Sequence, residues 1–259
     1  MVLGVTATQL VLTVLAGVAA GVISGLFGLG GGVVAVPAAL WISASSFHEA
    51  KAASLMVIVF GSTIALARHH RAGNVRWQRG LRLAGGGVAG SILSSLIAQD
   101  VAGTVLGQAF GVLVILVGLR MALAARPEEG RVCFPGAVFA LGFFAGTLTG
   151  FLGVGGGVVM TPGLALFGFP MHAAVATSLV GVIGNGFFAA VTQAFLGMGE
   201  AMLTVGVPLA VGAMLGGRAG AKLALVTPAD KLRRAFGVFL ALVGLRFLGV
   251  WEAVVGRFR

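Results

Sequence analysis

The feature that most constrains this chain is the length of its charge-free stretches. Residues 132–199, 68 consecutive positions, contain no Asp, Glu, Lys or Arg, and residues 1–48 contain none either. A helix needs about 20 predominantly apolar residues to cross the hydrocarbon core of a bilayer. Only 9% of the chain is charged, whereas a soluble domain carries about 25% charged residues. We therefore predict an all-α polytopic membrane protein, which excludes a cytosolic enzyme.

The basic balance of the chain, a formal net charge of +10, does not indicate nucleic-acid binding. The cations stand between apolar segments, as the positive-inside rule expects of membrane proteins. Cys133 is the one cysteine, so no cysteine cluster is available for a metal or a disulfide framework. His69 and His70 stand between arginines and indicate a solvated basic loop rather than a metal site. We predict no metal, no cofactor and no nucleic-acid partner.

The chain contains two copies of one unit. Residues 25–37 and 150–162 are identical at 8 of 13 positions, at an offset of 125. Residues 109–120 and 235–246 are identical at 9 of 12 positions, at an offset of 126. Self-similarity at a fixed offset indicates an internal repeat. We predict two homologous transmembrane repeats, which are residues 1–125 and 126–259.

Each repeat begins with a long apolar stretch that glycines interrupt, and it continues with three plainer helices. We predict these helices at 52–68, 82–98 and 104–123 in the first repeat, and at 174–195, 201–223 and 232–251 in the second. As one helix, the interrupted stretch at 9–42 would be about 50 Å long, which is too long for one pass through a bilayer. It is expected to bend or double back at 28–32, and its second copy at 153–157.

The cations indicate how the second repeat is oriented relative to the first. If the interrupted stretch crosses the membrane once, the repeats run parallel; if it enters and returns on one side, they are inverted. Five arginines surround the loop at 68–82, whereas the equivalent loop at 193–202 holds Glu200 and no cation. The inverted arrangement places 13 of the 17 Lys and Arg residues on the cytoplasmic side, as the positive-inside rule expects. We therefore favour inverted repeats.

The glycine clusters at the two breaks predict a substrate site. In transporters with inverted repeats, discontinuous helices place the site near the bilayer midplane. A short helix that begins there presents backbone N–H groups and its positive dipole end, which bind an anion without a charged side chain. The alternative is that the glycines only permit a tight turn and close helix packing. The glycines are Gly28, Gly30, Gly31 and Gly32 in the first repeat, and Gly153, Gly155, Gly156 and Gly157 in the second.

Polar side chains near the breaks are the next candidates for substrate binding, because hydroxyl and amide groups can replace part of an anion's hydration shell. They are Ser24, Ser54, Thr149, Thr177, Ser178 and Asn185. Ser54 and Ser178 are equivalent at an offset of 124, and Asn185 shares the helix face of Ser178 by its i+7 spacing. The alternative for any one hydroxyl is a hydrogen bond to its own helix or to a neighbouring helix.

Three further residues are candidates for coupling transport to protons or another ion, or for attracting the anion: His48, Lys51 and His172. His48 and His172 align between the repeats, and a histidine titrates near neutral pH. The alternative is that both are loop residues at the membrane edge. Lys51 shares a helix face with His48 and Ser54, where it either attracts anions or extends to the membrane interface.

The paired Gly-x-x-Gly-x-Gly-Gly-Gly-x-x-x-x-Pro segments, followed in the second repeat by Ala176-Thr177-Ser178, resemble the sulfite exporter TauE/SafE family of membrane permeases. The resemblance covers essentially the whole chain. It implies a bacterial or archaeal inner-membrane carrier with duplicated helical units. It also implies a substrate among the anions of sulfur metabolism, such as sulfite or a sulfonate. The first repeat departs from the pattern, with Ala52-Ala53-Ser54 at the equivalent place.

Together these observations predict a secondary transporter that moves a small sulfur-containing oxyanion by alternating access and binds it at the two breaks. The expected partners are this inorganic or organosulfur anion and the lipid bilayer. An anion channel of the same architecture is the alternative. An intramembrane enzyme is a distant third, because the charge-free segments supply no Asp or Glu for acid–base chemistry.

Overall fold

The computed structural model describes residues 7–43, 46–97 and 134–247, together with seven helical positions between 112 and 123. All regular structure in these parts of the chain is helical. Five segments are long and apolar enough to cross a membrane, so the predicted all-α membrane fold is confirmed. Most of the helix predicted at 104–123, and the end of the last predicted helix beyond 247, lie outside the described residues.

The helices follow the order that the sequence predicts. The first repeat contains α1 (Ala7–Phe27), α2 (Gly32–Ser43), α3 (Phe47–Arg71) and α4 (Trp77–Ile97). The second contains α6 (Pro135–Leu152), α7 (Gly157–Leu166), α8 (Met171–Gln193), α10 (Val207–Val226) and α11 (Ala229–Phe247). The short α9 (Gly199–Ala201) lies between α8 and α10, where Gly197 at a φ of 86° turns the chain. Because helices end at Phe27 and Leu152, both predicted bends are confirmed.

Local sequence signals explain several helix ends. Ser46 and Glu49 form a capping box at the start of α3, in which the Ser46 amide donates to the Glu49 carboxylate at 2.7 Å. Pro135 stands at the start of α6, where its missing N–H costs nothing. α6 ends at Gly153, whose φ of 66° is left-handed, a conformation that glycine adopts without steric penalty.

The two repeats interlock. α1 packs along α10, and the equivalent helix α6 packs along α4. Gly17 of α1 lies so close to the Leu209 carbonyl that a Cβ would collide with its oxygen, and Gly142 of α6 lies in the same way against the Leu83 carbonyl. Such close backbone approach requires glycine and suits helices in lipid. These glycines therefore allow the helices of the two repeats to pack backbone against backbone.

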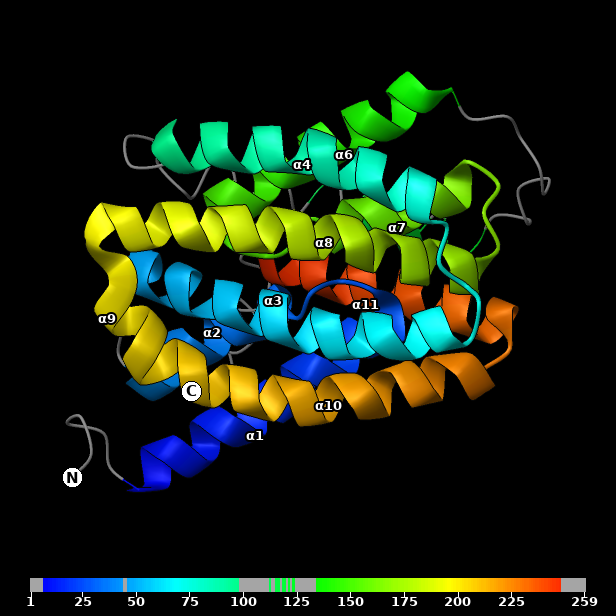
Figure 1. Cartoon of the computed structure of the whole chain (residues 1–259). Coiled ribbons are helices and arrows are strands. Elements are labelled where there is room, and N and C mark those ends of the chain that lie inside the picture. Colours follow the sequence, from blue (N-terminus) through cyan, green and yellow to red (C-terminus); the bar gives the residue numbers. More distant parts are fainter. Residues whose placement is uncertain are drawn as a thin grey trace.

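α3 and α8 lie side by side in the middle of the bundle, between α4 and α10 (Figure 1). The connection from α3 to α4 and the one from α10 to α11 lie at the same end of the molecule in Figure 1, and the turn between α8 and α10 lies at the opposite end. The two arginine- and lysine-rich connections therefore share one end of the bundle. The inverted orientation of the repeats in a bilayer, and the division of the chain after residue 125, stay predictions.

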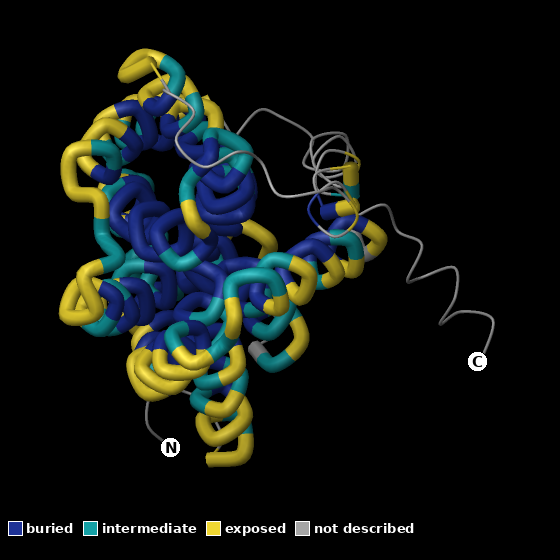
Figure 2. The backbone as a smooth tube through the Cα atoms, turned by 90° about the vertical axis from the view of Figure 1, so that its right-hand side faces the viewer, coloured by how far each residue is buried: buried dark blue, intermediate teal, exposed yellow. Residues whose placement is uncertain are grey.

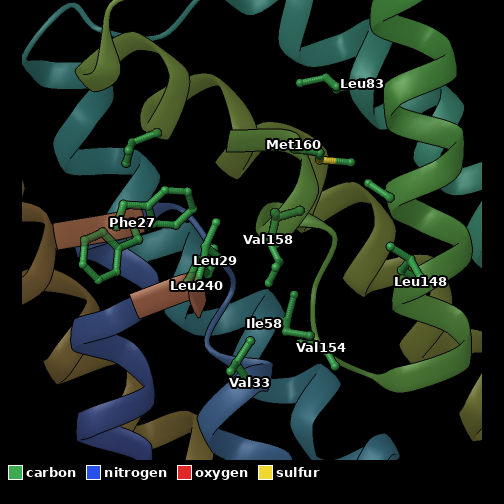
Figure 3. Close-up of a cluster of buried hydrophobic side chains, with 14 of the residues drawn as sticks. Phe27, Leu29, Val33, Ile58, Leu83, Leu148, Val154, Val158, Met160 and Leu240 are labelled. Carbon is green, nitrogen blue, oxygen red and sulfur yellow. The ribbon is translucent and has the colours of Figure 1, made fainter. Parts of the chain in front are cut away.

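Buried residues fill the middle of the bundle, and exposed ones form its outside (Figure 2). The core combines both repeats: Phe27, Leu29 and Ile58 of the first lie in one cluster with Val158 and Met160 of the second (Figure 3). The outside also carries many large apolar side chains, among them Leu12, Phe195 and Leu215. An apolar outer surface of this extent is typical of a protein that faces lipid.

Candidate anion-binding site

Glycines with left-handed backbone interrupt the helices at both breaks. Gly28, Gly30 and Gly31 have φ angles of 72°, 85° and 81°, and Gly153 and Gly155 have φ angles of 66° and 72°. Side chains other than hydrogen are disfavoured at such angles. The interruption of each helix is therefore encoded directly in its glycines.

The breaks also cross each other inside the bundle, in a reciprocal way. A Cβ at Gly32 would collide with the carbonyl oxygen of Gly153, and a Cβ at Gly157 would collide with that of Gly28. Gly32 is equivalent to Gly157, and Gly28 is equivalent to Gly153. The two contacts are therefore the same contact seen from each repeat in turn. The glycines that the sequence selects are thus brought together at one crossing.

The crossing places the N-terminal ends of α2 and α7 inside the protein. Two early amides of α7 donate to the Gly156 carbonyl at 3.0 and 2.9 Å, and two of α2 donate to the Gly31 carbonyl, both at 3.1 Å. Gly157 and Gly32 are buried and stand in the chain before the residues that make these bonds. Their amides lie at the positive end of each helix dipole. This is backbone chemistry that suits an anion.

Ser54 and Ser178 connect the breaks to the central helices. Ser54 Oγ donates to the Gly153 carbonyl at 2.8 Å, and Ser178 Oγ donates to the Gly28 carbonyl at 3.2 Å. Each hydroxyl is also within hydrogen-bond distance of a carbonyl of its own helix, at 2.6 Å for Ser54 and 2.9 Å for Ser178. Ser54 of the first repeat therefore binds the C-terminal end of α6, and Ser178 of the second repeat binds the C-terminal end of α1.

The other predicted hydroxyls have partners elsewhere. Ser24 Oγ lies 3.2 Å from Ser62 Oγ, between α1 and α3. Thr149 donates to the Ala145 carbonyl of its own helix at 3.0 Å. Thr177 accepts a hydrogen bond from the backbone amide of Arg76 at 3.1 Å, so it fixes the connection between α3 and α4. The structure does not bring these three side chains to the crossing.

Lys51 lies inside the protein, with 2% of its surface exposed. Its Nζ donates to the Gly150 carbonyl at 3.3 Å, near the C-terminal end of α6, where the helix dipole favours a cation. Within the described parts of the chain the buried residues include no Asp or Glu, so no buried carboxylate neutralises Lys51. Of its two predicted neighbours, Ser54 is buried on the same helix, whereas His48 is exposed.

Asn185 is fully buried on α8, and neither atom of its amide has a hydrogen-bond partner. Its amide lies against Gly87 of α4, where a Cβ would collide with Oδ1 and lie 2.7 Å from Nδ2, and the same Nδ2 would lie 2.9 Å from a Cβ at Gly156. Asn185 thus lies at the second break, whereas Ser178, two turns earlier on α8, contacts the first. The shared helix face of the two residues is predicted from their spacing, but α8 passes both breaks and each side chain meets a different one.

The histidines differ in their surroundings. His172 Nε2 lies 3.1 Å from the Ala224 carbonyl and 3.0 Å from the Thr227 carbonyl, so this side chain joins the start of α8 to the end of α10. His69 is fully buried, with Nε2 3.1 Å from the Gly25 carbonyl. The interpretation of His69 as part of a solvated loop is wrong, because α3 continues to Arg71 and turns His69 inward.

Sequence reasoning missed Thr161, a buried residue of α7. Its hydroxyl donates to the Phe27 carbonyl at 3.1 Å and to Ser178 Oγ at 2.8 Å, so it fastens the first break. A signal was present, because Thr161 stands where the first repeat has Val36.

As for a metal, the described residues contain no group of three or more His, Cys, Asp or Glu side chains placed to hold one.

Comparison with known proteins agrees with the architecture. The sequence model of the family described as Sulfite exporter TauE/SafE matches residues 13–247. A probable membrane transporter protein of Xylella fastidiosa (strain Temecula1) is 30% identical over 252 residues, which cover 93% of this chain and 95% of that protein. The probable membrane transporter protein YunE of Bacillus subtilis is 26% identical over 92% of this chain and 97% of its own length. No solved structure matches the chain significantly.

Proposed function

The chain belongs to the sulfite exporter TauE/SafE family, and on this premise we propose that it is a secondary transporter of a small sulfur-containing oxyanion, such as sulfite or a sulfonate. It is a multi-pass protein of the cell inner membrane and moves its substrate by alternating access. The oxyanion binds where the two breaks cross, among the N-terminal ends of α2 and α7.

The single observation that carries this proposal is the burial of Lys51. An isolated ammonium group in a low-dielectric interior is costly unless an opposite charge or several hydrogen bonds compensate it. Lys51 has one recorded hydrogen bond, to Gly150, and the buried part of the described chain offers no carboxylate. An anionic substrate supplies the missing charge, and ionisable residues inside a membrane usually mark a substrate path.

The backbone supports the same conclusion. The N-terminal ends of α2 and α7 offer amide donors and positive dipole ends, and an oxyanion presents oxygen atoms that accept hydrogen bonds. Transporters with broken helices use such half-helix ends for anionic groups. The site thus selects for negative charge with few charged side chains, in agreement with the charge-free sequence around it.

Uptake into proteoliposomes tests the proposal. Purified protein is reconstituted, and uptake of sulfite, methanesulfonate, sulfate and phosphate is measured with and without a pH gradient. We expect saturable uptake of at least one sulfur oxyanion. Replacing Lys51 by Gln is expected to raise the half-saturating concentration about 10- to 100-fold, because a hydrogen bond to a charged group contributes about 1.5–3 kcal/mol.

The matched control is Lys231→Gln, which removes the same charge from an exposed lysine of α11 and is expected to leave the half-saturating concentration unchanged. Equal effects of the two variants would show that only the overall charge matters and would reject the buried site. Uptake that rises linearly with substrate concentration would identify a channel instead of a carrier. Absence of uptake for every oxyanion would reject the proposal as a whole.

A further inference from the structure

The two breaks have related backbones, although Gly31 has a φ of 81° and its counterpart Gly156 a φ of -59°, and only the second break has a polar side chain without a partner. Gly31 and Gly156 are equivalent positions, directly before α2 and α7. A Cβ at either position would lie nearest to a backbone carbonyl oxygen, that of Ala20 at 2.7 Å from Gly31 and that of Ala145 at 2.8 Å from Gly156. Beyond these oxygens, the Cβ at Gly31 would meet a methyl group of Val57 at 3.1 Å, whereas the Cβ at Gly156 would meet the amide nitrogen of Asn185 at 2.9 Å. We propose, on the premise of the proposed function, that the protein binds one oxyanion, at the N-terminal end of α7, and that Asn185 determines its binding.

Asn185 is the observation that points to a ligand. Its side chain is fully buried, and both polar atoms lack a hydrogen-bond partner. Buried amides are almost always paired, so each exception asks for an explanation such as an absent ligand. The Nδ2 group faces Gly156 at the start of α7, which is where the helix presents its own amide donors. A bound oxyanion would accept a hydrogen bond from Nδ2 and complete its pairing.

The start of α7 fits an oxyanion for two further reasons. α7 has ten residues, which is long enough for a helix dipole, and the buried amide of Gly157 precedes its first helical hydrogen bonds. Lys51 lies on the same side of the molecule as this break, because its ammonium group contacts the last turns of α6 at Gly150. The second break thus has neutral donors at the start of α7 and one positive charge at the end of α6.

The first break lacks each of these polar groups. At the offset of 124 that relates Ser54 to Ser178, the position of Asn185 corresponds to Gly61 and that of Lys51 to Val175. Gly61 lies against Ala213, which is the counterpart of Gly87 in the second repeat. The contact between Gly61 and Ala213 therefore has a glycine and an alanine where the contact at the second break has Asn185 and Gly87.

The surroundings of α2 also offer an anion fewer polar side chains than those of α7. Gly32, at its start, borders an apolar pocket of about 440 Å³, which is lined mainly by α2 and α11 and which Leu152 and Val154 of the second break also reach. The two hydroxyls nearest to the first break, Ser178 and Thr161, already donate to the carbonyls of Gly28 and Phe27. The N-terminal end of α2 thus has only its backbone amides to offer, beside hydrocarbon side chains.

Binding stoichiometry tests this inference without any variant. Titration calorimetry of the purified full-length protein with sulfite, and with methanesulfonate and phosphate in separate runs, gives the number of sites per chain. We expect one site. Two equivalent sites per chain would overturn the inference while leaving the proposed transport function intact. Binding of no oxyanion at all would instead reject the proposed function, so the two failures are distinguishable.

Variants of Asn185 identify the site. Asn185→Ala is expected to weaken sulfite binding about 10- to 100-fold, the effect of one hydrogen bond to a charged partner. Asn185→Asp keeps the size of the side chain but adds a like charge, so we expect no measurable binding. Asn74→Asp is the matched control, because it makes the same change in the half-buried connection between α3 and α4. Unchanged affinity of both folded Asn185 variants would overturn the inference.

Discussion

The two breaks of this protein have equivalent glycines and two different environments. At the first break, Gly30 packs against Val182 and Ile58, and the hydroxyl groups nearby hold backbone carbonyls. At the second break lie an unpaired amide, from Asn185, and a buried ammonium group, from Lys51. The glycine contacts occur once in each repeat. Lys51 and Asn185, in contrast, have no polar residue at the equivalent position of the other repeat.

This difference separates structure from function at the crossing. The reciprocal contacts of Gly28, Gly32, Gly153 and Gly157 belong to the packing of the fold, because the two breaks approach each other more closely than a side chain would allow. A feature needed by the fold must be present twice. A single substrate needs its polar contacts only once, so the side chains that are present once, Lys51 and Asn185, are the ones to associate with binding.

Membrane orientation gives the largest expected effect, since labelling at each position is present or absent. Single cysteines replace Ala72, Glu200 or Lys231 in a chain with Cys133→Ala, and intact cells receive a maleimide that cannot cross membranes. We expect label at position 200 in intact cells, and at 72 and 231 only after permeabilisation, because inverted repeats place the basic connections inside. Positions 72 and 200 on the same side of the membrane, with position 231 on the opposite side, would show parallel repeats, and the breaks would then not be related by inversion.

Removing the glycine contacts at the crossing gives the next largest effect. Gly32→Ala and Gly157→Ala each place a methyl group against a carbonyl oxygen of the other break. Such overpacking costs about 1–3 kcal/mol, so both variants are expected to lower the free energy of unfolding by similar amounts. Thermal unfolding in detergent, followed by circular dichroism, measures the change.

The control for these variants is Gly136→Ala near the start of α6, where nothing lies within 4 Å of an added Cβ. There the alanine only reduces the conformational entropy of the unfolded chain. The free energy of unfolding should therefore stay the same or rise by up to about 1 kcal/mol. If one crossing variant were as stable as the natural protein and the other were not, the backbones of the two breaks would not be equivalent. The comparison between them would then lose its basis.

The positions of the breaks could be predicted from the sequence, but the partners of their side chains could not. Glycine clusters and repeat offsets locate the bends at 28–32 and 153–157 because positive φ angles are a local property of glycine. The direction of a side chain depends on which helix packs beside it. Asn185 faces the second break only because α4 presents Gly87 there, and His69 turns inward only because α3 passes the end of α1. The interlocking of the repeats decides both outcomes.

The smallest expected effect concerns the hydroxyl groups at the two breaks. Ser54→Ala and Ser178→Ala each remove a hydrogen bond to a break carbonyl, which should cost about 1 kcal/mol. Ser178 also accepts a hydrogen bond from Thr161, so Ser178→Ala combined with Thr161→Val should depart from additivity by about 0.5–3 kcal/mol. Ser54→Ala combined with Thr161→Val should be additive, because these residues serve different breaks. Additivity in both pairs would show that the hydroxyl groups at the first break do not act together, and the contrast between the breaks would rest on Lys51 and Asn185 alone.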